Sequence, residues 1–315
     1  MGTVGTSIPA AQRTVEAALR GRKADVRGQV FKVSALLALL VSLAFLLILL
    51  WTILAEALPV LRDRGLDFVT SSTSSLPSRA GVWQGLIGSL ILIGFVLLMA
   101  VPIGIAAAIY LQEYARDTWL NRTLTTTIRN LGGVPSIVYG ILGLVVFVKI
   151  MRPVTGPDSS GRSYISGGLT LAVLVMPIVI LVTMEALRSV PASLREGAYG
   201  VGATRWEVVR SHVLPYAAPG VFTGVILSMA RAFGETAPLI LVGAVQGYLN
   251  QAPGSVVETL QGPYTALPTL VFAWSRYPGD EWRANAAAAI VVLLAVILLV
   301  NLFAIILRNR YERRW

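Results

Sequence analysis

Six long apolar segments set the strongest limit on what this chain can fold into. A helix needs about 20 mostly apolar residues to cross the hydrocarbon core of a bilayer. Backbone groups in that core must be satisfied within the segment, so such segments are helices. The sequence therefore predicts an all-α, polytopic membrane protein with six transmembrane helices. The predicted spans are residues 33–58, 84–111, 126–150, 168–187, 217–246 and 284–307.

The composition excludes several classes of chemistry. Hydrophobic residues make up 55% of the 315 residues and charged residues only 13%, about half the charged fraction of a typical soluble domain. The absence of cysteine excludes disulfides, thiol catalysis and iron–sulfur clusters, and one histidine is too few for the usual histidine-based metal site. We therefore expect no catalytic residue, no metal and no bound cofactor in this chain.

Lysine and arginine are unevenly distributed between the predicted helices. If the N-terminus lies inside, the inner segments together with Arg129, just within the third span, hold 17 of the 26 basic residues. The outer segments together with Lys149, at the end of the same span, hold 8. This bias predicts that the polar tail 1–32 and the basic tail 308–315 are both cytoplasmic. The run 33–58 is too long for a cleaved signal peptide, so we expect it to remain as the first transmembrane helix. The asymmetry explains the net charge of +10 without nucleic-acid binding.

A polar stretch of residues 191–215 separates the fourth and fifth predicted spans. Ser193 and Glu196 have the spacing of a capping box at a helix start. Gly200 and Gly202 permit a sharp bend. A second amphipathic piece follows, with Trp206, Val209 and Val213 three to four residues apart. The pattern predicts a helix–turn–helix along the cytoplasmic face; the alternative is a surface helix that merely packs under the bundle.

Two opposite charges lie within the fifth predicted span. Arg231 and Glu235 sit near the middle of 217–246 and are four residues apart, so they share one helix face. Each charge is costly against lipid, which predicts that this face points into the bundle or into a wet cavity. Gly234 and Pro238 flank the pair and weaken the helix where a bend could form.

Two interpretations of this pair remain open. It is either an internal salt bridge that holds helices together, or Arg231 is a gate or transient anion contact on a translocation path. The guanidinium fork matches phosphate oxygens, and Glu235 would orient that fork and compete with the anion for it. We include Thr236 among the expected path residues. Ser136 follows Pro135 in a Gly-Gly-Val-Pro-Ser break, where a plain packing kink and a path-lining role are equally compatible with the sequence.

The stretch 191–215 resembles the "EAA" loop of ABC-importer permeases, which reads E-A-A, three residues, G, nine residues, I-x-L-P. Gly197 and His212 depart from that pattern. The resemblance implies the type I permease fold over residues 84–307 and a coupling loop that docks on an ATPase. The chain itself has no phosphate-binding loop, so ATP and Mg are expected on a partner ATPase. The matching residues, expected to couple to it, are Glu196, Ala198, Gly202, Leu214 and Pro215.

Further segments resemble phosphate permeases of the Pst system, and the PstA type more than the PstC type. They are Arg-Ala-Phe-Gly-Glu-Thr-Ala-Pro-Leu from residue 231, and residues 133–140, 264–268 and 305–311. Residues 180–184 contain no arginine where many chains of this type have one, which puts a second cationic contact from this subunit in doubt. The resemblance implies a permease subunit that imports inorganic phosphate across the bacterial cytoplasmic membrane by alternating access.

The same resemblance implies the partners. They are a PstC-like second permease forming a heterodimer, a PstB-like ATPase dimer, a PstS-like phosphate-binding protein and the membrane lipid. Two alternatives are kept: a permease of the same architecture for another oxyanion such as sulfate or molybdate, and an ATPase-independent carrier.

Overall fold

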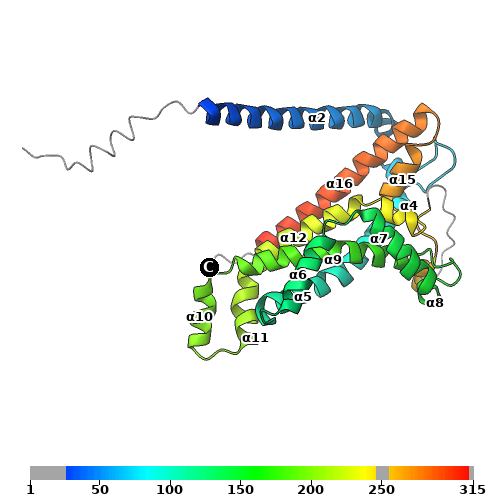
Figure 1. Cartoon of the computed structure of the whole chain (residues 1–315). Coiled ribbons are helices and arrows are strands. Elements are labelled where there is room, and N and C mark those ends of the chain that lie inside the picture. Colours follow the sequence, from blue (N-terminus) through cyan, green and yellow to red (C-terminus); the bar gives the residue numbers. More distant parts are fainter. Residues whose placement is uncertain (1–25, 246–254, 312–315) are drawn as a thin grey trace, which may run out of the picture. The chain divides into compact units, whose positions relative to one another are not determined.

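The computed structural model describes residues 26–245 and 255–311, and every regular element among them is a helix (Figure 1). The predicted all-α class is confirmed. The chain divides into two units, Met1–Thr52 and Ile53–Trp315, which are described separately. Most of the predicted tail 1–32, together with Gln246 and residues 312–315 of the predicted basic tail, lies outside the described residues.

The helix α2 (Val26–Arg64) is 39 residues long, so it begins inside the predicted tail and continues past the predicted end at residue 58. Between Val26 and Thr52 every side chain except Leu50 is exposed. From Val33 onward this stretch is almost wholly apolar around its circumference, and such a helix needs lipid or other helices to cover it.

The second unit is built around α9 (Tyr164–Arg188), which is its most thoroughly buried long helix. Glycines on two neighbouring helices bring their backbones close to α9. Gly104 on one side faces Val179, and Gly224 on the other faces Val182, with no room for a Cβ at either glycine. The flanking helices are α4 (Trp83–Phe95), η1 (Val96–Ala100), α5 (Val101–Ile109) and η2 (Tyr110–Tyr114), which form one rod, and α12 (Leu214–Gly234).

Two predicted spans are broken rather than continuous. The span predicted at 126–150 consists of α6 (Trp119–Leu131) and of α7 (Ser136–Gly143) continued by η3 (Leu144–Ile150), and the two parts are bent by 103°. The expected kink is therefore a full break, because Pro135 has no N–H to continue the ladder.

The span predicted at 217–246 ends early. The helix α12 stops at Gly234, and a short α13 (Ala237–Leu241) follows. Pro238 explains the stop, since its ring would clash with the carbonyl of the residue four positions before it, which is Gly234.

The remaining helices close the ends of the second unit. Counting the bent pair as one span, six helical segments of the described chain are long and apolar enough to cross a membrane, and five without it. The sixth predicted span is extended at both ends. The helices are α3 (Leu66–Thr70), α8 (Arg152–Thr155), α10 (Ala192–Gly200), α11 (Arg205–Val208), η4 (Val209–Val213), α14 (Val256–Gln261), α15 (Leu267–Trp274) and α16 (Asp280–Tyr311).

Candidate functional site

The two broken spans meet each other. A Cβ placed on Gly140 of α7 would lie 2.7 Å from the Cα of Pro238 in α13. Only glycine allows this approach of one backbone to another. The start of α7 at Ser136 is one turn before Gly140, and Glu235 and Thr236 directly precede α13. The structure therefore brings the two breaks into one region. The sequence did not reveal this proximity, because the two segments are far apart in the chain.

Arg231 and Glu235 are paired at this place. The Arg231 Nε donates to Glu235 Oε1 at 3.2 Å, with 46% of the arginine side chain exposed and 14% of the glutamate side chain. The expectation that the pair lies near the middle of a helix is wrong: Arg231 is in the last turn of α12 and Glu235 is the residue after its end. A cation in the last turn of a helix is favourable for the helix dipole.

The pairing with Glu235 occupies only part of the hydrogen-bonding capacity of the Arg231 guanidinium. Five N–H groups are available on a guanidinium, and Glu235 takes one of them among the described residues. Arg231 also lies within electrostatic range of Tyr139 on α7. Since a charge facing lipid is costly, the exposed part of Arg231 requires water, an anion or another chain beside it.

Ser136 and Thr236 occupy the same region but differ in their contacts. Ser136 is half-buried and starts α7 without a side-chain cap, so N–H groups at that helix end are available. The Thr236 hydroxyl lies 3.5 Å from the Gly234 carbonyl, a marginal hydrogen bond. Tyr139 of α7 joins the two sides of the bend between α6 and α7 by donating its hydroxyl proton to the Leu131 carbonyl at 2.9 Å.

Residues 191–215 form the predicted helix–turn–helix. The turn between α10 and α11 contains Gly202 at φ +86, a conformation that glycine adopts without steric cost. The expected capping box at Ser193 is wrong, because Pro191 is the N-cap and Ser193 lies within the first turn of α10. The capping box of this loop is instead Thr204 with Glu207, at the start of α11.

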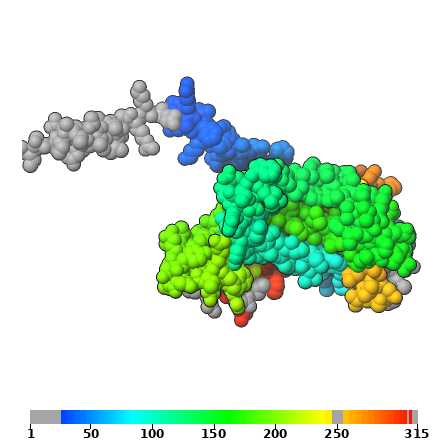
Figure 2. All heavy atoms as spheres, turned by 60° about the horizontal axis from the view of Figure 1, so that its bottom comes forward, coloured from blue at the N-terminus to red at the C-terminus, as the bar shows by residue number. Residues whose placement is uncertain are grey.

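The five motif residues fall on different faces of this loop. Ala198 is buried in the same apolar cluster as Val208 and Val213, whereas Glu196 and Gly202 are exposed. Leu214 and Pro215 open α12, the former half-buried and the latter exposed. In Figures 1 and 2, α10 and α11 extend beyond the ends of the neighbouring helices. The side chains of Tyr199, Val201 and Trp206 in this projection are exposed.

Arg195, the residue before Glu196, anchors the loop to the bundle. Its Nη2 and Nε donate to the two carboxylate oxygens of Glu113 at 2.7 and 3.4 Å, and 21% of the arginine and 8% of the glutamate side chain are exposed. Nη1 and Nη2 also donate to the carbonyls of Val190 and Leu187, each at 2.8 Å. One side chain thus joins α10 to the end of η2 and to the end of α9.

Two further arginines contact the neighbours of Glu113. The end of η2 is therefore held by three arginines in consecutive order, which we call the arginine clamp. Its contacts are Arg188 Nε to Gln112 Oε1 at 3.0 Å, Arg195 to Glu113, and the Arg205 guanidinium 5.8 Å from the centre of the Tyr114 ring. Sequence inspection missed this feature because the paired residues are far apart in the chain.

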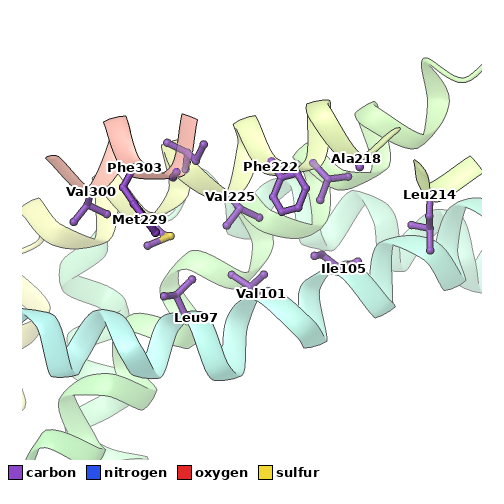
Figure 3. A pocket seen from close by; sticks show the side chains of 13 residues that line it. Leu97, Val101, Ile105, Leu214, Ala218, Phe222, Val225, Met229, Val300 and Phe303 are labelled. Carbon is purple, nitrogen blue, oxygen red and sulfur yellow. The ribbon is translucent and has the colours of Figure 1, made fainter. Parts of the chain in front are cut away.

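An apolar groove of about 510 Å³ lies between three helices of the second unit (Figure 3). Leu97 and Val101 line one side, Phe222 and Met229 of α12 the second, and Phe303 of α16 the third. A groove without charged or hydrogen-bonding side chains suits acyl chains or an apolar helix, not an anion. Among residues 26–245 and 255–311, no group of three or more histidines and carboxylates could hold a metal ion.

Comparisons with known proteins identify the architecture. The profile of a family described as "Binding-protein-dependent transport system inner membrane component" matches residues 100–315. The chain is 34% identical over 253 residues to the probable ABC transporter permease protein YqgH of Bacillus subtilis, covering 79% of this chain and 78% of that protein. It is 30% identical over 287 residues to the phosphate transport system permease protein PstA of Yersinia pestis, covering 90% and 92%.

A solved structure shows the same fold. A chain of a bacterial alginate ABC transporter in complex with an alginate-bound periplasmic protein superimposes with a TM-score of 0.61 at 18% identity, covering 91% of this chain and 98% of that one. The predicted type I permease fold is confirmed. At this identity the likeness concerns the fold alone.

Proposed function

Because the chain belongs to the family of binding-protein-dependent transport system inner membrane components, we propose that it is the permease subunit through which an ATP-driven importer moves inorganic phosphate across the bacterial cytoplasmic membrane. The chain is an ABC importer permease; phosphate as its substrate is the proposal. The observation that carries it is the half-exposed Arg231 held by Glu235 where two broken spans meet.

The chemistry of this region favours an oxyanion over a cation or a sugar. The free N–H groups of Arg231 form a planar fork that matches phosphate oxygens. Ser136 adds a hydroxyl and the uncapped start of α7, and helix N-termini attract anions. The similarity to the PstA of Yersinia pestis supports phosphate among the oxyanions.

Glu235 gives the site a means of release. Its carboxylate already occupies one edge of the Arg231 guanidinium, so an incoming anion must compete with it. The anion is then held weakly, as a translocation path requires. Glu235 also accepts a hydrogen bond from a protonated phosphate oxygen, an interaction that sulfate cannot offer near neutral pH. Thr236, the residue after Glu235, lies next to this proposed anion contact.

The loop of residues 191–215 couples the bundle to an ATPase in this proposal. Its exposed Tyr199, Val201 and Trp206 offer an apolar docking surface. Movement of α10 passes through Arg195 to the end of η2 and the end of α9. Alternation between outward and inward openings is a population shift biased by ATP at the ATPase. ATP and Mg are bound by a PstB-like ATPase dimer and not by this chain.

The proposed assembly also includes a PstC-like permease and a PstS-like phosphate-binding protein. The apolar sequence of α2 and the apolar groove of Figure 3 support a membrane-embedded partner, since acyl chains or an apolar helix of another subunit suit such surfaces. The charge bias of the sequence supports cytoplasmic positions for both termini and for the coupling loop.

Uptake by the reconstituted complex tests the substrate. Proteoliposomes with the permease pair, the ATPase and the binding protein should accumulate labelled phosphate only with ATP inside. Excess unlabelled phosphate should compete, and equal sulfate or molybdate should not. Competition by sulfate or molybdate but not phosphate would assign another oxyanion. Uptake that continues without ATPase and follows an ion gradient would instead establish an ATPase-independent carrier.

A further inference from the structure

A polar cavity that does not include Arg231 lies beside the arginine clamp. It measures about 350 Å³ and lies between the end of η2, the start of α6 and the end of α9. Three arginines line it, Arg116, Arg122 and Arg188, against one carboxylate, Asp117. This excess of guanidinium groups gives the cavity a positive potential.

The three arginines of this cavity differ in how many hydrogen bonds and ion pairs their side chains make. Arg122 pairs with Asp117, and Arg188 pairs with Glu185 at 3.0 Å. The Arg116 side chain makes no hydrogen bond or ion pair with any residue that the structure describes. One guanidinium is thus wholly available at the cavity, and Arg188 retains N–H groups beyond those given to Glu185 and Gln112.

Two threonine hydroxyl groups on α6 add hydrogen-bond acceptors to the lining of this cavity. The Thr125 hydroxyl donates its proton to the Asn121 carbonyl at 2.9 Å, and the Thr126 hydroxyl donates to the Arg122 carbonyl at 2.9 Å. Each hydroxyl has only one proton, so toward the cavity both oxygens act as acceptors. A ligand with negative charge for the arginines and a proton for the threonine oxygens would complement this lining.

We propose that this cavity is a second anion site that binds a protonated phosphate group, namely inorganic phosphate. Phosphate near neutral pH carries both negative charge and at least one proton, whereas sulfate and the phosphodiester of a lipid headgroup carry no proton. The guanidinium forks of Arg116 and Arg188 supply donors to the oxygens. The cavity's role as a station after Arg231 rests on the proposed function; its binding of phosphate does not.

Residue-resolved protection of arginines tests the site. The permease–ATPase complex is placed in zwitterionic nanodiscs without nucleotide and treated with phenylglyoxal, and modification at each arginine is quantified by mass spectrometry. Inorganic phosphate should slow the modification of Arg116 and Arg188. Arg283, an exposed arginine paired with Asp280 at 3.8 Å, is the control and should react at an unchanged rate.

Two variants sharpen this experiment. In Arg116→Gln the phosphate concentration that half-protects Arg188 should rise about tenfold, the effect of one lost charge-assisted hydrogen bond. In Thr125→Val the preference for phosphate over sulfate should shrink, because one acceptor is gone. An unchanged preference would remove the threonine from the site.

The outcomes separate this site from the path at Arg231 and from lipid. Protection of Arg116 that persists in Arg231→Gln supports an independent site even if phosphate uptake itself is not found. Protection that disappears in Arg231→Gln overturns it. If only anionic phosphatidylglycerol protects Arg116, the cavity binds a headgroup and the assignment to inorganic phosphate is wrong. Equal modification of Arg116 under all conditions overturns the proposal.

Discussion

Arg195 of the loop 191–215 and Glu113 of η2 form a bidentate ion pair, in which the shorter N–O distance is 2.7 Å. The same guanidinium binds two carbonyls at the end of α9. It is the most completely engaged charged side chain of the loop, which contains the ATPase-docking residues of the proposed mechanism. A rigid joint at this position transmits displacement, whereas a flexible one would absorb it.

Breaking this pair should uncouple ATP hydrolysis from transport. In Glu113→Gln the mostly buried arginine keeps its carbonyl contacts but loses its charge partner, a change that costs about 3 kcal/mol for a buried pair. Uptake by the reconstituted complex should fall while ATP hydrolysis persists. Asp280→Asn, which removes an exposed ion pair with Arg283, is the control and should leave both rates unchanged. A Glu113→Gln complex that transports at the normal ratio of substrate to ATP would contradict the clamp's role.

Arg231→Gln should reduce phosphate uptake to background while the complex still assembles. Glutamine keeps the unbranched, polar stem but is shorter and lacks the positive charge, so the broken spans keep their packing and lose the anion contact. Co-purification of all subunits, measured beside uptake, separates the two effects. Normal uptake would show that Arg231 only holds helices together. Loss of assembly would likewise assign the residue a structural role.

A methyl group at Gly140 should separate the two broken spans. The added Cβ in Gly140→Ala would meet the Pro238 Cα at 2.7 Å, and a backbone atom cannot rotate away. Overpacking of this kind costs about 1–3 kcal/mol, so the thermal unfolding midpoint and uptake should both decrease. Gly94→Ala is the matched control, since no heavy atom lies within 4 Å of its Cβ. A Gly140→Ala protein as stable as Gly94→Ala would refute the close approach.

Gly202→Asp should abolish ATPase docking. A Cβ added at this position meets no heavy atom within 4 Å, but the φ of +86 is unfavourable for a residue with a Cβ. The added charge would face the proposed docking partner. Gly200→Ala, on the same loop with no heavy atom within 4 Å of its Cβ, should retain the ATPase in co-purification. Retention by the aspartate variant as well would remove this turn from the interface.

The Asp117–Arg122 pair gives a prediction about pH. Hydrogen bonds from Arg122 hold the pKa of the exposed Asp117 carboxyl below its usual value of 3.8. The carboxylate thus stabilises the folded loop at and above that pH, and the contribution is lost as pH falls toward the lowered folded pKa. Carboxyl NMR should show Asp117 titrating below 3.8, and Arg122→Gln should raise the midpoint. An unchanged midpoint in the variant would disprove the pairing.

The sequence predicted the helical class because apolar length alone determines it in a bilayer. It also located the helix–turn–helix, since Gly202 and the apolar spacing from Val209 to Val213 act over a few residues. The break at Pro135 was expected only as a kink, because sequence shows where a helix is weakened and not whether neighbouring packing opens it. The early stop at Gly234 has the same origin.

Contacts between distant segments were beyond prediction. Glu113 and Arg195 are 82 residues apart, and nothing in the local pattern of either residue identifies the other. The meeting of Gly140 with Pro238 likewise depends on how α7 and α13 both pack against α9. Ser193 and Glu196 matched the capping-box pattern, but Ser193 lies two residues beyond the N-cap, Pro191. Local chemistry was therefore recoverable, whereas the joints between segments required the fold.

Water access at Thr236 tests most directly whether substrate passes the Arg231–Glu235 pair. The chain has no cysteine, so Thr236→Cys provides a single thiol in this subunit, and Leu298→Cys on the apolar, 67% exposed part of α16 is the control. If substrate passes this pair, a charged, membrane-impermeant thiol reagent should reach Thr236→Cys from one side without ATP and from the other with ATP trapped. Phosphate should slow the reaction, and Leu298→Cys should stay unlabelled. Labelling of Thr236→Cys only by lipid-soluble reagents, from neither aqueous side, would contradict the account.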